Sequence, residues 1–303
     1  MINDWPVMYE ELFSRRGLSL DRVKTLCIVA ECGGIAKAAD GDPVRQSQFS
    51  RQLRELGEFF EVDLTRRRGK GVELTMAGKE LAALGREVLE ALGDFRRGVQ
   101  GGEKNLRLGA GESLIQWQVL PQLKRLRKDL PGVLLSMSNL RAKEIINQLA
   151  EAQIDFGLAS LVELPAGLAG ARLGLLRYRI FVSTAIVTRK KPTWKEALKL
   201  PLVGLEGEGR LAQKISQVAA RLGLKPEIAV RCSSLPGVAT ALKEIDGFAI
   251  LPEAAAQGGL VAIEAPFLRE FGREVHLVWS VRRLAIRDEM VRWRQKLVNA
   301  LAW

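Results

Sequence analysis

The chain has 303 residues, 47% of them hydrophobic, so its length favours two or three domains and its composition excludes a disordered protein. No hydrophobic run approaches the ~20 residues that span a bilayer. The first residues, with Asp4, Glu10 and Glu11, lack the basic and apolar regions of a secretory signal. We therefore expect a cytoplasmic protein with no membrane partner.

The net charge of +11 suggests a polyanionic partner but does not locate its binding site. Residues 1–100 hold 16 basic and 16 acidic residues, so the whole excess lies in residues 101–303. Local clustering is more informative, because Val44–Lys70 carries seven basic side chains against four acidic ones.

The N-terminal part predicts three helices. After an extension at 1–17, apolar residues recur at helical spacing from Leu20 and the pattern stops at Gly33. A short helix at Ile35–Ala39 leads to a sharp turn that ends in Pro43, a residue suited to the start of a new helix. The third helix, Val44–Phe60, carries one apolar stripe (Phe49, Leu53, Leu56, Phe60) and polar residues elsewhere.

Two short strands, Val62–Leu64 and Val72–Leu74, flank the basic segment Arg66–Gly71 as a hairpin would. The order of helix, helix, turn, helix and basic hairpin predicts a winged helix-turn-helix that binds double-stranded DNA over residues 18–75.

A long helix is expected at Met76–Val99. Its apolar residues are spaced by threes and fours, as in a coiled-coil seam, which indicates a homodimer. The residues of this seam are Leu81, Leu84, Val88, Ala91 or Leu92, Phe95 and Val99. Gly101 and Gly102 end this linker segment, residues 76–102, as a hinge.

From residue 103 to 303 strands and helices alternate, which predicts an α/β domain with mostly parallel sheets. Strands are expected at 106–108, 133–137, 156–159, 178–182, 202–204, 228–230, 248–251 and 275–281. Helices are expected at 119–128, 142–151, 211–222, 237–245 and 288–301.

From Leu20 to Gly78 the chain resembles the LysR-type regulators. The resemblance lies in the order and spacing of Leu20, Leu26, Val29-Ala30-Glu31, Gly33 and Ala38-Ala39, of Gln46, Ser50-Arg51-Gln52-Leu53 and Leu56, and of Arg67, Val72-Glu73-Leu74-Thr75 and Ala77-Gly78. The later part resembles that family's co-inducer domain more loosely, at Leu106–Gly109, Leu120-Pro121, Pro131–Val133, Asp155–Ala159 and Gly247–Pro252.

The resemblance implies a type-2 periplasmic-binding-protein architecture for residues 103–303. One subdomain would hold about 103–182 plus 266–303 and the other about 183–265, with an effector in the cleft between them. It also implies a homo-oligomer, a dimer or a tetramer. The chain departs from the family at the start of the third helix, which reads Arg45-Gln46-Ser47-Gln48, and at Gly57, which costs ~1 kcal/mol against Ala inside a helix.

The third helix and the wing supply the expected DNA contacts. Arg45 suits guanine O6 and N7, and Gln46 or Gln48 suits adenine N6 and N7. Phosphates suit the remaining candidates, Ser50, Arg51 and Arg54 on the helix and Arg66, Arg67, Arg68 and Lys70 on the wing. Phe49 is either a base contact or, at spacing four from Leu53, a core residue.

The effector cleft is expected beyond the carboxyl ends of the strands, where backbone N–H groups and hydroxyls suit a small organic anion. Ser113 is the first candidate. For each serine, helix capping is the alternative, and Arg141 is alternatively a surface charge. The candidates are Ser113, Leu114, Leu140, Arg141, Ala159, Ser160, Leu205, Glu206, Ser233 and Ser234.

Other classes of protein find less support. The single His276 sits in an alternating strand without a catalytic or metal-binding motif, so we expect no enzyme, cofactor or metal. A solute-binding transport protein would be exported and would lack a helix-turn-helix. The odd set Cys27, Cys32 and Cys232 supports neither a disulfide framework nor a zinc site, and buried free thiols are expected. A sensor domain without a small ligand, and a redox response through oxidation of Cys232, stay open.

Overall fold

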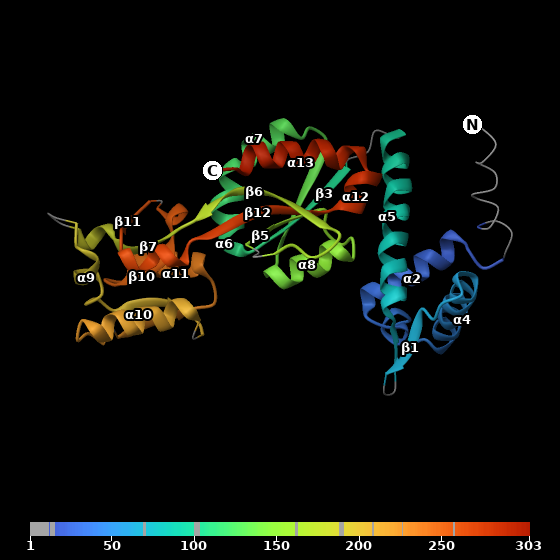
Figure 1. The fold of residues 1–303 in the computed structure, drawn as a ribbon, viewed down its shortest axis with the longest axis horizontal. Helices are drawn as coiled ribbons and strands as arrows, with labels where there is room; N and C mark the ends of the chain where they lie inside the picture. The colour runs from blue at the N-terminus through green and yellow to red at the C-terminus, as the bar shows by residue number, and fades with distance from the viewer. Residues whose placement is uncertain are drawn as a thin grey trace.

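The computed structural model describes residues 12, 16–68, 71–99, 104–160, 163–187, 191–207, 209–225, 227–256 and 258–303. Most of the expected N-terminal extension, Lys70 of the wing and the expected hinge at Gly101 and Gly102 lie outside these residues. Figure 1 shows the long helix α5 (Met76–Val99) between the N-terminal helices and a first sheet, with a second sheet at the far end of the molecule.

The N-terminal part is a winged helix-turn-helix. Helix α2 (Leu20–Cys32) begins at Ser19, whose hydroxyl accepts a hydrogen bond from the Arg22 N–H at 3.3 Å, and it is followed by α3 (Ile35–Ala38) and α4 (Pro43–Phe60). Their core holds Leu26, Val29, Ile35, Leu53, Leu56, Leu64 and Leu74. The expected helices are confirmed within two residues at each end.

The wing differs from the expectation. Strand β1 spans Thr65–Arg68 and pairs antiparallel with β2 (Gly71–Leu74), from Thr65 opposite Leu74 to Arg68 opposite Gly71. The apolar run Val62–Leu64 is therefore not a strand; it leads out of α4, and Leu64 is buried in the core. The basic residues at 66–68 stand on a strand rather than in the hairpin loop.

Helix α5 has the expected bounds and two different faces. One is apolar and exposed along Leu84, Val88, Leu92, Phe95 and Val99. The opposite face carries Glu87, Glu90 and Asp94, which meet arginines of the C-terminal part. Leu81, expected in the seam, instead packs against the helix-turn-helix core.

The first sheet has the order β4-β3-β5-β12-β6. Its strands are β3 (Lys104–Ala110), β4 (Val133–Asn139), β5 (Phe156–Ala159), β6 (Leu168–Leu176) and β12 (Arg273–Ser280). The helices that belong to it are α6 (Glu112–Leu114), α7 (Leu123–Asp129), α8 (Ala142–Ala150), α12 (Val281–Ile286) and α13 (Asp288–Leu301). We call this body subdomain I.

The second sheet, subdomain II, has the order β11-β7-β10-β8-β9. Its strands are β7 (Tyr178–Ser183), β8 (Leu202–Leu205), β9 (Ile228–Cys232), β10 (Phe248–Pro252) and β11 (Leu260–Ile263). Its helices are α9 (Trp194–Ala197), α10 (Arg210–Arg221) and α11 (Leu235–Glu244). Between the elements named so far lie short turns at Ile115–Val119 (η1, a π-helix), Leu120–Gln122, Thr184–Ile186, Glu253–Ala255 and Pro266–Phe271.

Two sequence expectations about this part are wrong. The sheets are mixed rather than mostly parallel, because β12 runs antiparallel to β5 and β6, and β7 runs antiparallel to β10 and β11. The strand at 178–183 pairs in the second sheet, and Leu268 is buried in that sheet's core. The chain therefore crosses between the subdomains near Arg177 and Gly272, rather than after 182 and before 266.

A buried group of charged residues joins α5 to subdomain I. We call Glu90, Asp94, Arg107, Asp155, Arg283 and Arg287 the arginine–acid cluster. Arg283 and Asp155 are both 0% exposed and form an ion pair. Glu90 lies 2.7 Å from the guanidinium nitrogens of both Arg283 and Arg107, while Arg287 pairs with Asp94. The linker helix is thus bound to its own effector half by charge.

Gly57 shows how a tight turn overrides helix propensity. The Val62 N–H donates to the Gly57 carbonyl at 3.0 Å, and a Cβ on Gly57 would lie 2.8 Å from the Val62 oxygen. Propensity alone predicts that Gly57→Ala adds about 1 kcal/mol of stability. We expect instead a loss of about 1–3 kcal/mol in chemical unfolding, because the backbone of the turn must move.

Gly93 of α5 is the matched control for Gly57. The nearest atom to a Cβ there is Arg97 Nη1 at 3.4 Å, on a flexible side chain. Gly93→Ala is therefore expected to stabilise the chain by about 0.5–1 kcal/mol. A gain of the same size for Gly57→Ala would contradict the turn geometry.

Candidate DNA-binding surface and effector cleft

The surface of α4 presents the polar residues expected to meet DNA. Asp42 Oδ1 accepts from the Val44 N–H at 2.8 Å and fixes the start of the helix. Leu53 and Leu56 turn the opposite face into the core. Exposed side chains on the outer face are Arg45, Ser47, Gln48, Ser50, Arg51 and Arg54, and Gln46 is half-buried.

Three arginines of this surface form weak ion pairs with nearby acidic residues. The ion pairs Arg45–Asp42 at 3.7 Å, Arg51–Glu55 at 3.9 Å and Arg54–Glu58 at 3.5 Å are long and exposed. Exposed pairs of this kind hold a side chain only weakly. A phosphate or a guanine edge therefore competes well for these guanidinium groups.

Phe49 and the arginines of the wing differ in their exposure and in their contacts. Phe49 is half-buried and packs against the helix-turn-helix core, which favours its structural alternative. Arg66 and Arg67 are both exposed, and Arg66 also pairs with Glu73 on the neighbouring strand at 2.7 Å. The side chain of Arg68 lies outside the described residues, as does Lys70.

The expected effector residues converge on one cavity of about 650 Å³ between the two subdomains. Loops after β3, β4 and β5 reach it from subdomain I, and the ends of β8 and β9 reach it from subdomain II. Its lining includes Ser113, Leu114, Leu140, Arg141, Ala159, Ser160, Leu205, Ser233 and Ser234. Glu206 lines a neighbouring cavity instead.

A hydrogen bond between described residues crosses the cleft. The Ser234 hydroxyl donates to Glu112 Oε1 at 3.1 Å and accepts from the Gly237 N–H at 3.2 Å. Ser234 is therefore the N-cap of α11, as its alternative predicted, and it also joins the subdomains. Nearby, Trp117 on the π-helical turn η1 of subdomain I packs into the subdomain II core with Phe181 and Val238.

The other polar groups of the cleft differ in whether they have partners. The hydroxyls of Ser113, Ser160 and Ser233 make no hydrogen bond to the part of the chain that the structure describes. The carboxylates of Glu112 and Glu144 already accept hydrogen bonds, Glu144 from the Arg141 N–H at 2.6 Å. The described residues include no ion-pair partner for Arg141 or Arg273.

Tyr178 and Arg273 were not expected from the sequence. They line the cleft because the chain crosses between the sheets beside them. Burial raises the pKa of the Tyr178 phenol, so its O–H remains a donor at neutral pH. In a two-sheet fold, the residues where the chain crosses between the sheets face the cleft. Tyr178 and Arg273 could therefore have been predicted if the crossings had been placed at Arg177 and Gly272.

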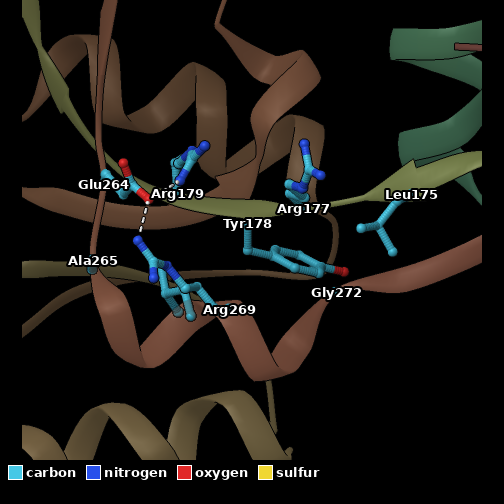
Figure 2. Close-up of a pocket in the computed structure, with 9 residues that line it drawn as sticks. Leu175, Arg177, Tyr178, Arg179, Glu264, Ala265, Arg269 and Gly272 are labelled. Atoms are coloured by element: carbon cyan, nitrogen blue, oxygen red, sulfur yellow. Dashed lines mark hydrogen bonds and ion pairs between the residues drawn. The ribbon is translucent and has the colours of Figure 1, made fainter.

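Behind this crossing lies a smaller cavity of about 420 Å³, shown in Figure 2. Arg179 and Arg269 lie 3.3 Å and 3.2 Å from Glu264, and Arg179 also pairs with Glu253 at 3.2 Å. These charges compensate one another. We therefore interpret this cavity as part of the connection between the two subdomains near Arg177 and Gly272.

The three cysteines are free. Only Cys27 is buried as expected, and burial raises the pKa of its thiol to about 11, so the reactive thiolate is scarce at neutral pH. Cys32 is exposed and Cys232 is half-buried. Within the described residues, no group of three or more potential metal ligands occurs, and no helix is long and apolar enough to cross a membrane.

Two family models match the chain. Residues 20–79 match the bacterial regulatory helix-turn-helix protein of the lysR family, and residues 100–293 match the LysR substrate binding domain. Among curated proteins, a probable nitrogen assimilation transcriptional activator of Synechococcus elongatus is 23% identical, over 78% of this chain and 80% of the relative. The regulator DgdR of Burkholderia cepacia is 22% identical, over 82% of each chain.

Solved structures share the fold. Full-length LysG of Corynebacterium glutamicum, with the effector arginine bound, has a TM-score of 0.65 at 16% identity, over 94% of this chain and 98% of that one. A full-length OxyR variant of Pseudomonas aeruginosa has a TM-score of 0.64 at 17% identity, over 95% of each chain.

Proposed function

Because the chain belongs to the LysR family of bacterial transcription regulators, we propose that a small organic anion in the cleft modulates its action at a promoter. Residues 18–75 are the DNA-binding domain, 76–102 the dimerising linker and 103–303 the effector domain. The protein works in the cytoplasm as a homodimer or homotetramer. It is a regulator and not an enzyme, as its family and relatives are.

The observation that carries this proposal is the composition of the cleft. Strand ends of both subdomains converge there. Among the described residues, the hydroxyls of Ser113, Ser160 and Ser233 have no hydrogen-bond partner, and Arg141 and Arg273 have no counter-ion. An anion between the subdomains would add contacts to both, and so would stabilise the arrangement of the subdomains in which Ser234 bonds to Glu112.

A thermal-shift panel of small organic anions tests the cleft. A ligand at ~100 times its Kd should add about 2.7 kcal/mol to the stability of the domain that binds it. Ser113→Ala and Ser160→Ala should each weaken binding about tenfold or less, as loss of one hydrogen bond implies. Ser136→Ala, at a residue of β4 that lines neither the cleft nor the neighbouring cavity, is the control. If no anion stabilises the chain, the alternative of a sensor domain without a small ligand gains support.

DNA binding is tested by a contrast between two kinds of arginine. Arg45→Ala or Gln48→Ala should cost about 1–3 kcal/mol on the cognate site and relax specificity there. Arg67→Ala should weaken all sites alike and reduce the salt dependence of binding. Arg127→Ala, which removes an exposed charge from α7, is the matched control. If the Arg45→Ala, Gln48→Ala, Arg67→Ala and Arg127→Ala variants all bind DNA in a gel shift with the affinity of the unmodified chain, α4 is not the recognition helix.

The redox alternative rests on Cys232 alone in the effector half. This thiol is half-buried at the end of β9, beside the serines of the cleft. The measurement that checks it is thiol reactivity in the folded protein, with Cys32 as the exposed reference.

A further inference from the structure

A second cavity, larger than the cleft, lies inside subdomain II. Its volume is about 780 Å³, and it lies between α10 on one side and β8, β9 and β10 on the other, with one side open to solvent. We call it the α10 chamber. Most of its wall is apolar: Leu202, Leu211, Ile215, Ile228, Val238 and Ile250.

The cavity is an open pocket and not an internal void, because Leu205 and Ile228 in its wall are 45% and 47% exposed. The deeper part of its wall belongs to the core of subdomain II, because Ile215 is only 6% exposed and Ile250 only 5%. The volume falls in the range of about 300–1,000 Å³ that is typical of small-molecule sites. The chamber therefore has the size and the lining of a site for an apolar group.

The chamber is continuous with the effector cleft. Tyr178, Leu205, Leu235 and Arg273 line both cavities. Leu205 and Leu235 are apolar. Tyr178 supplies a protonated phenol, and Arg273 supplies a guanidinium without an ion-pair partner among the described residues. A molecule that extends from the cleft into the chamber would pass polar donors first and an apolar wall afterwards.

The charges lie at the cleft end. Arg273 lines both cavities and Arg141 lines the cleft, while the chamber adds Arg231 and Glu206 at the ends of β9 and β8. From α10 the wall takes Leu211, Ala212 and Ile215, together with the uncharged polar residues Gln213, Ser216 and Gln217. This separation of charged and apolar surface matches a ligand with one anionic end.

We propose that the effector is an amphipathic organic acid, whose anionic head lies in the cleft near Ser113, Ser160 and Arg273 and whose apolar body occupies the α10 chamber. This inference rests on the proposed function, because it names the ligand class of the same site. It assigns specificity for the length of the apolar body to α10, an element that carries none of the expected effector residues.

The test is a series of straight-chain carboxylates, from acetate to decanoate, titrated calorimetrically into the full-length chain. Affinity should rise about fourfold for each added methylene, the fold-change that corresponds to about 0.8 kcal/mol of buried CH₂, until the chamber is filled. Octanol serves as the uncharged partner of octanoate and should bind at least tenfold more weakly.

Two tryptophan variants on α10 locate the apolar body. Ala212 lines the chamber, so Ala212→Trp should abolish the dependence on chain length and leave the affinity for the shortest acids unchanged. Ala220 lies on the exposed face of the same helix, so Ala220→Trp should leave the whole series unchanged. Loss of length dependence in both variants would overturn the assignment to the chamber.

The outcomes separate the two proposals. If short and long acids bind equally well to the unmodified chain, the chamber takes no part and only the further inference fails. If octanol binds as tightly as octanoate, the anionic head is wrong. If no carboxylate of any length binds, the proposed anion site fails and the further inference fails with it.

Discussion

Asp155→Ala is expected to destabilise the C-terminal domain by about 3–5 kcal/mol, the cost of leaving a buried charge without its partner. Asp155 is 0% exposed, and its carboxylate accepts hydrogen bonds from Arg283, from Arg287 at 3.3 Å and from the Arg107 N–H at 2.7 Å. Removal leaves three arginines with Glu90 and Asp94 of α5, and with Glu289, which lies 3.2 Å from Arg287.

Urea unfolding followed by tryptophan fluorescence measures this effect. Trp293, one of six tryptophans in the chain, lies on α13 beside the arginine–acid cluster, with the Arg287 guanidinium 5.7 Å from its ring, so part of the signal comes from this region. The control is Glu274→Ala, because Glu274 pairs with Arg172 at 2.8 Å on the exposed surface of the same sheet. That pair should contribute at most about 1 kcal/mol. Equal losses for the two variants would show that the cluster is no more stabilising than a surface pair.

The contacts of the arginine–acid cluster could not be predicted from the sequence. The apolar spacing of α5 predicts both of its ends, because helix periodicity is a local signal. Glu90 and Asp94 sit between those apolar residues and look like ordinary solvent-exposed charges. Their partners Arg283 and Arg287 lie 193 residues away, and nothing in the local pattern around either pair records the contact.

Strand β6 illustrates a second limit. Gly170, Gly174 and Arg172 interrupt the apolar pattern of Leu168–Leu176, so the sequence gives no strand there. The structure explains Gly174, because a Cβ at that position would lie 2.6 Å from the Trp303 carbonyl oxygen at the end of the chain. A glycine that looks like a strand breaker is thus required by a long-range packing contact.

The candidate effector residues were easier to predict than the boundaries of the subdomains. Ser113, Leu140 and Ser160 follow strands directly, and the carboxyl ends of parallel strands meet at one edge. The crossings near Arg177 and Gly272 depend instead on which sheet β7 joins. That choice is made by pairing with β10, seventy residues further along the chain.

Leu92→Glu is expected to dissociate the dimer. Leu92 is 50% exposed on the apolar face of α5, between Val88 at 41% and Phe95 at 73%. A row of apolar side chains on the surface of one chain marks an interface. In a twofold-symmetric dimer the new carboxylate is buried twice, at about 3 kcal/mol for each copy, so the dimer Kd should rise about 10⁴-fold.

Sedimentation velocity at micromolar concentration measures the dissociation, and Leu92→Met, which keeps an apolar side chain, is the control. A monomer presents one α4 to DNA instead of two, so it neutralises about half as many phosphates. The slope of log K against log salt concentration should therefore fall to about half its value. Because the acidic face of α5 holds subdomain I while its apolar face would hold the partner copy, effector affinity should survive the substitution. If Leu92→Glu still sediments as a dimer, the two copies meet elsewhere than along the exposed face of α5.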